Sequence, residues 1–319
     1  MDPLLILFGL GVGVLVGATG MGGGSLMTPL LILLFGIKPV VAIGTDLAYA
    51  AITKTVGGWR HLRAGTVHTS LSLWLALGSC PGALLGVAIL EWLDLGDILL
   101  VLVAASLLLT GSLVLLRALI WSGEGERDNI EMSLRHRVAA VVLGFTVGVC
   151  LGITSAGSGT LIAIGLILAF RLSPRRVVGT DVAHAAILLW VAAFAHLISG
   201  NVDLALAGTI LIGSIPGVWI GASLATRLPE RGLRPALGIV LLSSGLALLG
   251  KAGFDIPAAI LVGTPVVLVI ISYLLLRRRS EPTPEPIAAA QTVSAPGAAA
   301  HASKPHPPSR KPQPAPAEV

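Results

Sequence analysis

An internal duplication constrains this chain more than any other feature of its sequence. Residues 9–86 align with residues 144–221 at a constant offset of 135, without a gap, and 32 of the 78 aligned residues are identical. The matches include polar motifs that apolar composition alone would not repeat, such as Gly-Thr-Asp at 44–46 and again at 179–181. Duplicated apolar segments are typical of secondary transporters, in which two homologous halves build one site at their interface.

The composition indicates a polytopic membrane protein. Hydrophobic residues make up 55% of the chain, charged residues only 12%, and the mean hydropathy is +0.91. No soluble domain buries so large an apolar fraction, whereas a membrane span needs roughly 17 to 25 apolar residues. The sequence therefore predicts an all-α membrane protein. The expected spans are residues 3–18, 40–58, 71–91, 97–120, 138–153, 177–198, 204–225, 233–249 and 257–276.

Two further apolar stretches, residues 25–37 and 160–170, are too short for an ordinary crossing. They occupy corresponding positions in the two repeats, and such a pair is a good sequence pointer to a transporter's binding site. We therefore expect two inverted repeats of transmembrane helices with short broken or re-entrant helices. The expected parts are a first repeat (1–120), a cytoplasmic loop (121–137), a second, inverted repeat (138–249), an additional helix (250–276) and a disordered basic, Pro/Ala-rich tail (277–319).

The distribution of Lys and Arg predicts the orientation. If each short stretch and the helix after it count as two passes, all strongly basic loops fall on one side, which the positive-inside rule assigns to the cytoplasm. The N-terminus is then outside and the tail inside. Because the start of the chain lacks a signal-peptide pattern, we expect residues 3–18 to remain as the first helix. The basic loops are 60–63, 121–137, 171–176, 227–234 and the cluster from 277.

Two carboxylates are candidates for function. Of sixteen Asp and Glu residues, only Asp46 and Asp181 lie inside predicted membrane segments. One buried charge there costs roughly 2.5 to 3.5 kcal/mol, so two at equivalent positions need a reason. They are either a protonatable or ligand-orienting pair near the pseudo-two-fold axis, or helix caps near the chain breaks. His184 follows Asp181 by three residues and could form an Asp-His proton relay with it.

A glycine-rich turn precedes each short stretch, at residues 19–25 and 154–160. Glycine lets the chain turn tightly, and the helix that follows directs free N–H groups and a partial positive charge into the turn, which favours an anion. Close helix packing in membranes also selects glycine, so a structural role stays open. The predicted substrate ligands are Gly22, Gly23, Gly24, Ser25 and Thr45 in the first repeat and Gly157, Ser158, Gly159, Thr160 and Thr180 in the second.

The repeated prolines are predicted hinges, because proline frees backbone carbonyls and permits a kink, although a kink that serves packing alone is an alternative. These are Pro39, Pro81, Pro174 and Pro216.

Three other polar residues are assigned to membrane surfaces. His61 and His196 follow the two aspartates by fifteen residues, about 22 Å along a helix, so we expect them to be interfacial caps. Lys54 has no counterpart in the second repeat, and we expect its side chain to extend toward the interface.

The motifs together resemble the sulfite exporter TauE/SafE family of membrane permeases, over about residues 5–250. The resemblance implies a bacterial inner-membrane transporter of small sulfur-containing anions such as sulfite, sulfonates or sulfoacetate, linked to protons. The motifs are Gly17-x-x-Gly20-x-Gly22-Gly23-Gly24-Ser25, Pro39, Gly44-Thr45-Asp46, Arg60-His61-x-Arg63-x-Gly65 and Ser79-x-Pro81-Gly82, echoed in the second repeat.

We therefore predict a proton-coupled secondary transporter, an exporter by preference, that works by alternating access. An anion channel, a non-transporting membrane protein and an intramembrane aspartyl protease stay as alternatives; the protease would need two carboxyls that share a proton. Metalloprotease, paired-cysteine, phosphate-loop and haem-attachment motifs are absent from the sequence, so we expect no metal and no organic cofactor. The expected partners are a small anion and the lipid bilayer, with no nucleic acid, and the chain is a monomer or a homodimer.

Overall fold

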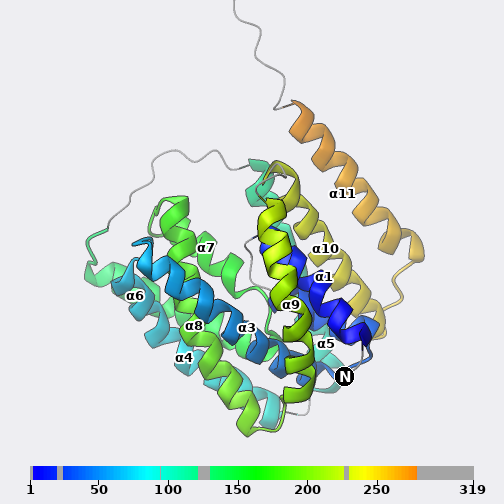
Figure 1. The fold of residues 1–319 in the computed structure, drawn as a ribbon, viewed down its shortest axis with the longest axis horizontal. Coiled ribbons are helices and arrows are strands. Elements are labelled where there is room, and N and C mark those ends of the chain that lie inside the picture. The colour runs from blue at the N-terminus through cyan, green and yellow to red at the C-terminus, as the bar shows by residue number, and fades with distance from the viewer. Residues whose placement is uncertain (1–2, 20–23, 94, 121–129, 226–229, 279–319) are drawn as a thin grey trace, which may run out of the picture. The chain divides into compact units, whose positions relative to one another are not determined.

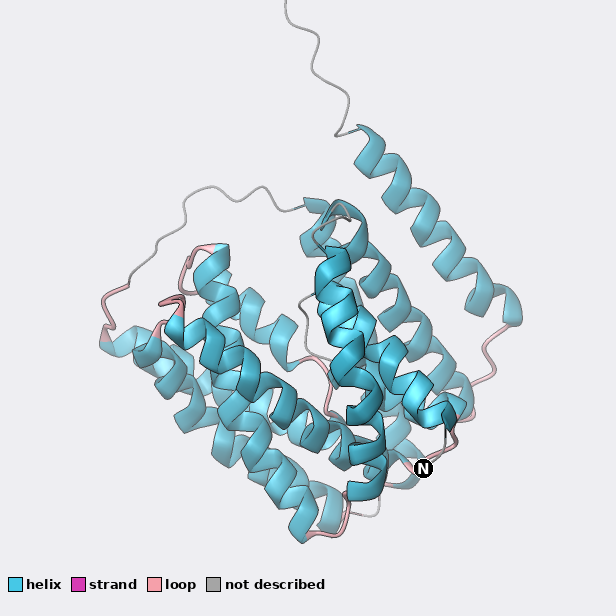
Figure 2. Ribbon diagram, in the orientation of Figure 1, coloured by secondary structure: helices cyan, strands magenta, loops and turns pink. Residues whose placement is uncertain are grey.

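The computed structural model describes residues 3–19, 24–93, 95–120, 130–225 and 230–278. These residues form helices joined by loops, without a β-strand among them (Figure 2), which confirms the predicted all-α class. The helices are α1 (Pro3–Thr19), α2 (Gly24–Leu34), α3 (Pro39–Arg63), α4 (Thr69–Trp92), α5 (Gly96–Ile120), α6 (Leu134–Thr154), α7 (Ser158–Leu168), α8 (Pro174–Ile198), α9 (Leu204–Ala225), α10 (Glu230–Lys251) and α11 (Ala258–Arg278).

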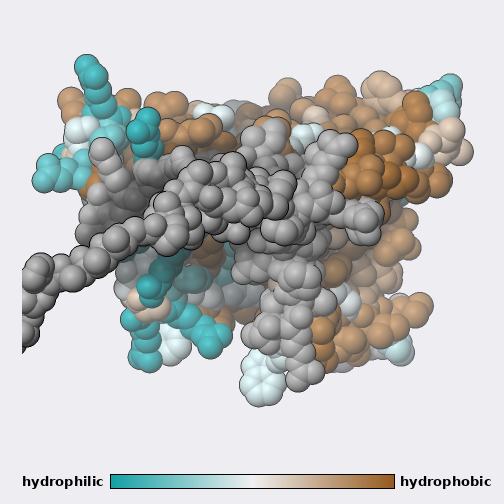
Figure 3. Space-filling view, turned by 90° about the horizontal axis from the view of Figure 1, so that it is seen from above, coloured by the Kyte–Doolittle hydropathy of each residue, from teal (hydrophilic) through white to brown (hydrophobic). Residues whose placement is uncertain are grey.

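The outer faces of the helices are apolar, as contact with lipid requires. Five described helices, α4, α5, α6, α8 and α9, are long and apolar enough to cross a membrane. Large apolar side chains are exposed on them, including Leu73 on α4 and Ile215 and Trp219 on α9. In Figure 3 apolar residues dominate one side of the visible described surface, and most of the polar residues lie toward the other side. A surface of this kind fits a protein embedded in a bilayer.

The two short stretches form separate short helices. α2 and α7 have eleven residues each, which gives a length of about 16 Å at 1.5 Å per residue. That is about half the roughly 30 Å thickness of the hydrocarbon core. Neither helix can cross a membrane alone, in agreement with the prediction.

The two repeats exchange equivalent contacts. α1 packs along α9, and α6 packs along α4, so the first helix of each repeat packs against the other repeat (Figure 1). Gly13 lies against the backbone of Ser214, while its repeat counterpart Gly148 lies against the backbone of Ser79. Every partner in the first contact has its counterpart in the second. A two-fold exchange therefore relates the halves, and glycines let the backbones approach this closely.

The central pair of equivalent helices, α3 and α8, packs antiparallel. Gly44 near the start of α3 lies against Asn201, just after α8, whereas Gly58 near the end of α3 lies against Ala183 near the start of α8. α5 and α10, a second equivalent pair, also pack antiparallel. The predicted inversion requires equivalent helices that run in opposite directions, as these two pairs do, and the inversion itself stays a prediction.

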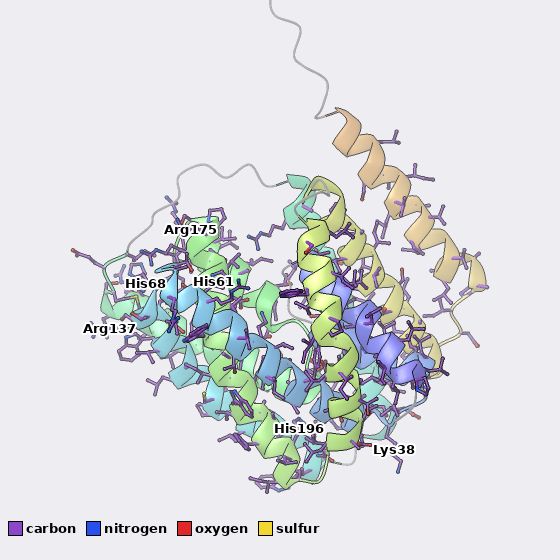
Figure 4. The ribbon with its side chains drawn as sticks, viewed as in Figure 1. Lys38, His61, His68, Arg137, Arg175 and His196 are labelled. Carbon is purple, nitrogen blue, oxygen red and sulfur yellow. The ribbon has the colours of Figure 1, made fainter. Side chains whose placement is uncertain are left out.

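Basic residues gather at one end of the molecule. His61, Arg137 and Arg175 lie near one another there, whereas His196 and Lys38 lie at the opposite end (Figure 4). The predicted inversion places His61 and His196 on opposite sides of the membrane, and the side that each faces stays a prediction. His196 itself is fully buried, and its Nε2 lies 3.0 Å from the carbonyl oxygen of Gly152 in the last turn of α6.

Labelling from the two sides of the membrane tests the inversion. Ala64 and Ser199 are repeat counterparts that follow the last residues of α3 and α8. Single cysteines at these positions, in a background without Cys80 and Cys150, should react with impermeant maleimide from opposite sides, Ala64→Cys from the cytoplasm. Reaction of both from the same side would show that the repeats are parallel.

Candidate functional site

The second glycine-rich turn, between α6 and α7, contains two residues with left-handed backbone. Ser155 has a φ of 54° and Gly157 a φ of 89°. The hydroxyl of Thr154 donates to the carbonyl oxygen of Cys150 at 2.7 Å and so fixes the end of α6. Gly157 then caps α7 without a side-chain hydrogen bond. Because the first N–H groups of a helix lack intrahelical acceptors, this end of α7 presents donors and a partial positive charge.

Asp46 approaches this turn from the other repeat. Its Oδ2 accepts hydrogen bonds from Ser155 Oγ at 2.9 Å and from Thr28 Oγ1 of α2 at 2.6 Å. The two hydroxyl oxygens also lie 2.6 Å apart. Asp46 is fully buried, and its Oδ1 has no hydrogen-bond partner within the described parts of the chain. Asp46 therefore joins the short helix α2 of one repeat to the glycine turn of the other.

Asp181 lies at the other end of the same turn, beside Gly159. A Cβ added to Gly159, the second residue of α7, would lie 3.4 Å from Asp181 Oδ2. The carboxylate is thus directly beside the N-terminus of α7. Asp181 is buried, and its Oδ1 makes no hydrogen bond to any described residue.

Lys54 is the partner of Asp181. Its Nζ lies 3.8 Å from Asp181 Oδ2, and its side chain is only 13% exposed. The expectation that Lys54 extends to the interface is therefore wrong. A lysine so little exposed within a membrane segment carries a large desolvation cost unless a carboxylate or other anion lies near it, and here that group comes from the opposite repeat.

Thr110 of α5 adds a polar group to the turn. It is 1% exposed, and its hydroxyl has no hydrogen-bond partner among the described residues. A Cβ added to Gly157 would lie 2.7 Å from Thr110 Oγ1. The turn is therefore flanked by polar groups from α3, α5 and α8.

A pair of equivalent hydrogen bonds joins the halves beside the proline-containing helices. His184 Nε2 lies 2.8 Å from Ser79 Oγ of α4. At the repeat-related place, the hydroxyl of Tyr49 is hydrogen-bonded to Ser214 of α9. His184 thus pairs with Ser79, and no hydrogen bond joins it to Asp181, with which a relay was predicted; its Nδ1 is buried without a partner among the described residues.

Thr45 and Thr180 hold loops of the opposite repeat. Thr45 Oγ1 accepts the backbone N–H of Asp203 at 3.1 Å, and Thr180 Oγ1 accepts that of His68 at 3.0 Å. These equivalent hydrogen bonds anchor the chain just before α9 and α4. Both hydroxyls, predicted as substrate ligands, are buried and engaged in this way.

The other predicted ligands divide between the two turns. Gly22 and Gly23 lie outside the described residues, and Gly24 and Ser25 are the first two residues of α2. In the second turn, Gly157 is the N-cap of α7. Ser158, Gly159 and Thr160 form its first turn.

The predicted hinge prolines occupy two kinds of position. Pro39 and Pro174 are the first residues of α3 and α8, where the missing N–H costs nothing. Pro81 and Pro216 lie inside α4 and α9.

The two aspartates do not face each other. In the antiparallel register of α3 and α8, Gly58 lies against Ala183, which separates Asp46 from Asp181 by about 20 Å along the helices. An aspartyl dyad needs two carboxyls close enough to share a proton. The arrangement is instead one turn with a separate carboxylate on each flank.

Sequence reasoning overlooked three residues of this site. Thr28 and Thr110 resemble ordinary helix residues, because a threonine within a helix usually bonds to its own backbone. Lys54 carried a usable signal, since an intramembrane lysine is a functional candidate by default.

Comparison with known proteins identifies relatives over most of the chain. A family model described as "Sulfite exporter TauE/SafE" matches residues 5–248. The probable membrane transporter protein YjnA of Bacillus subtilis is 40% identical over 262 residues, which cover 78% of this chain and all of that protein. YdhB of the same organism, also described as a probable membrane transporter protein, is 31% identical over 246 residues, 77% of this chain and 99% of its own. No solved structure matches the chain significantly.

Proposed function

Because this chain belongs to the sulfite exporter TauE/SafE family, we propose that it is the membrane transporter of a small sulfur-containing anion, such as sulfite, a sulfonate or sulfoacetate, and that it couples transport to protons. The observation that carries the proposal is the placement of Asp46 and Asp181 on two flanks of one glycine turn at the start of a short helix.

The anion binds at the N-terminus of α7. The N–H groups of Ser158, Gly159 and Thr160 have no acceptor within the helix, and an anion satisfies them while it meets the positive end of the helix dipole. No side-chain cap at Gly157 takes up these N–H groups. The first glycine turn, of which residues 20–23 lie outside the described part of the chain, stays a predicted ligand site of the other repeat.

Hydrogen counting supports a proton on Asp46. Asp46 Oδ2, Thr28 Oγ1 and Ser155 Oγ make three mutual contacts of 2.6 to 2.9 Å. The two hydroxyls supply two hydrogens, so an ionised Asp46 leaves one contact without a proton. A proton on Oδ2 supplies the third hydrogen, and one of the two hydroxyls then accepts from the carboxyl while the other still donates to it. Release of that proton would loosen the link between α2 and the turn, which couples protonation to the arrangement of the two repeats.

Alternating access follows from the two-fold exchange. When two halves make equivalent contacts with each other, each half can also adopt the conformation that the other half has in this structure. That second arrangement would open the site to the other side of the membrane. The antiparallel packing of α3 with α8 supports an axis in the plane of the membrane. We assign the basic end and the C-terminal tail to the cytoplasm. The membrane potential, negative inside, favours outward movement of a net negative charge by about 2.3 kcal/mol per charge per 100 mV. Export is therefore the favoured direction.

Flux in proteoliposomes tests the function. The purified chain should give saturable flux of at least one anion from a panel of sulfite, thiosulfate, methanesulfonate, sulfoacetate and sulfate. Acid on the side that holds the anion should stimulate it. Gly157→Ala is the inactive control. Its Cβ would lie 2.7 Å from Thr110 Oγ1 on a left-handed backbone, so the turn cannot keep its shape and flux should be lost. A chain with no saturable flux of any anion would contradict the proposal.

A further inference from the structure

We infer that Asp181 occupies, in this structure, the place of the transported anion, and that Lys54 is the residue that recognises the anion's charge. The inference rests on the proposed function and names the group that selects its substrate class. Asp181 and the anion then compete for one site.

Geometry places a single anion position between two positive groups. Asp181 Oδ2 lies 3.8 Å from Lys54 Nζ on one side and beside Gly159 at the start of α7 on the other. A carboxylate in this place has the charge and planar oxygens of a small oxyanion. Anything that binds both the lysine and the helix N-terminus must take the position that this carboxylate holds.

A second observation points to a ligand here. Thr110 Oγ1 is buried beside Gly157 without a hydrogen-bond partner among the described residues. Asp181 Oδ1 is also unpartnered. Buried polar atoms normally have partners, and an oxyanion with several acceptor oxygens supplies one to a threonine hydroxyl. Asp181 has only two oxygens and satisfies Lys54 with one of them.

The site belongs to one repeat only. Lys54 corresponds to Leu189 in the second repeat, which is buried and apolar. Asp46, the counterpart of Asp181, is held by two hydroxyls and forms no ion pair within the described parts of the chain. The two aspartates are equivalent in sequence, yet they meet different groups. The ion pair at the Asp181 flank of the turn is therefore made by Lys54, a residue that the second repeat lacks.

Competition makes the proton a co-substrate. When the anion takes Lys54, an ionised Asp181 would be a buried negative charge beside another, so it accepts a proton from water on the side that the site faces. One proton then moves with each anion. A divalent anion such as sulfite together with this Asp181 proton has one net negative charge.

Other ionisable groups also lie near Asp181 or on the helices packed around it. Arg117 of α5 acts on Asp181 as a second positive charge, after Lys54 in strength. His184, on the same helix, is hydrogen-bonded to Ser79 of α4. α4 also contains Cys80 beside Ser79, and Glu91, which acts on His196 at the far end of α8. α7 contains no ionisable residue.

Sulfite binding to the purified full chain tests the competition. The Kd for sulfite is measured for the wild type and for Asp181→Asn at each pH of a series, and the quantity compared is the wild-type Kd divided by the variant Kd. Sulfite's own titration affects both proteins equally and cancels in the ratio. Asp181→Asn cannot compete, so we expect the ratio to rise with pH, by up to about tenfold per unit as one proton is linked, and to level off in acid. A ratio that does not change with pH would overturn the inference.

Lysine variants test charge recognition. Lys54→Met should weaken sulfite binding by at least about thirtyfold, the usual minimum for losing one partner of a buried charge pair. The double variant Lys54→Met with Asp181→Asn removes both charges of the pair, so it should fold and still fail to bind. Lys38→Met, at an exposed lysine before α3, is the matched control. Unchanged binding in the folded double variant would overturn the role of Lys54.

Failure of the proposed function can be told apart from failure of the competition between Asp181 and the anion. If the wild-type chain neither binds nor transports any anion of the panel, the function itself is wrong. If it transports another anion of the panel in place of sulfite, the same ratio is measured with that anion. Transport with a pH-independent ratio would leave the function standing and remove only the competition.

Discussion

Gly213→Ala should prevent the chain from accumulating as folded protein, whereas Gly208→Ala in the same helix should have no such effect. A Cβ at Gly213 would overlap the backbone carbonyl oxygen of Ile6 in α1, and that backbone cannot give way without separating α9 from α1. A Cβ at Gly208 meets no atom within 4 Å. Overpacking of a tight contact costs about 1 to 3 kcal/mol, and backbone overlap lies at the upper end.

Size-exclusion profiles and thermal unfolding of the two variants in detergent measure this difference. Gly78, the repeat counterpart of Gly213, overlaps the backbone of Val141 in the same way, so Gly78→Ala should reproduce the loss. A Gly213→Ala protein as abundant and as stable as the Gly208→Ala control would show that α1 and α9 are not packed at this distance.

The sequence predicted the helices well because membrane spans are long and apolar. The short stretches at 25–37 and 160–170 correspond to α2 and α7, within three residues at each end. The burial of Asp46 and Asp181 was also predictable, since each lies within a segment that is otherwise apolar.

The partners of these residues could not be predicted, because they depend on which helices meet. Thr28 reaches Asp46 and Ser155 only because α2 packs on α3 beside the turn of the other repeat. Lys54 finds Asp181 through the antiparallel packing of α3 and α8. Repeat symmetry could not reveal this pair, since Lys54 has no counterpart.

The glycines show the same limit. Gly78, Gly82 and Gly86 are spaced by four residues along α4, a spacing that predicts a close helix contact. The spacing does not identify the partner, which is the backbone of α6. Asp46 and Asp181 have the same sequence context, and only their tertiary neighbours distinguish them.

Asp46→Asn should abolish the response of transport to a pH gradient while sulfite binding survives. Asparagine keeps the shape of the side chain and can still hydrogen-bond to Thr28 and Ser155, but it cannot carry a proton. Asp203→Asn is the matched control, because Asp203 caps the start of α9 near the surface and its Oδ1 accepts the N–H of Leu206 at 2.9 Å. Asparagine caps a helix equally well, so this variant should behave as wild type.

Sulfite flux in proteoliposomes, compared with and without acid on the sulfite side, tests the central claim that the anion moves together with protons carried by the buried aspartates. We expect the acid stimulation seen in wild-type and Asp203→Asn protein to fall to the level without a gradient in Asp46→Asn and Asp181→Asn protein, while both variants still bind sulfite. Wild-type acid stimulation in both buried-aspartate variants would contradict the claim and assign Asp46 and Asp181 a structural role.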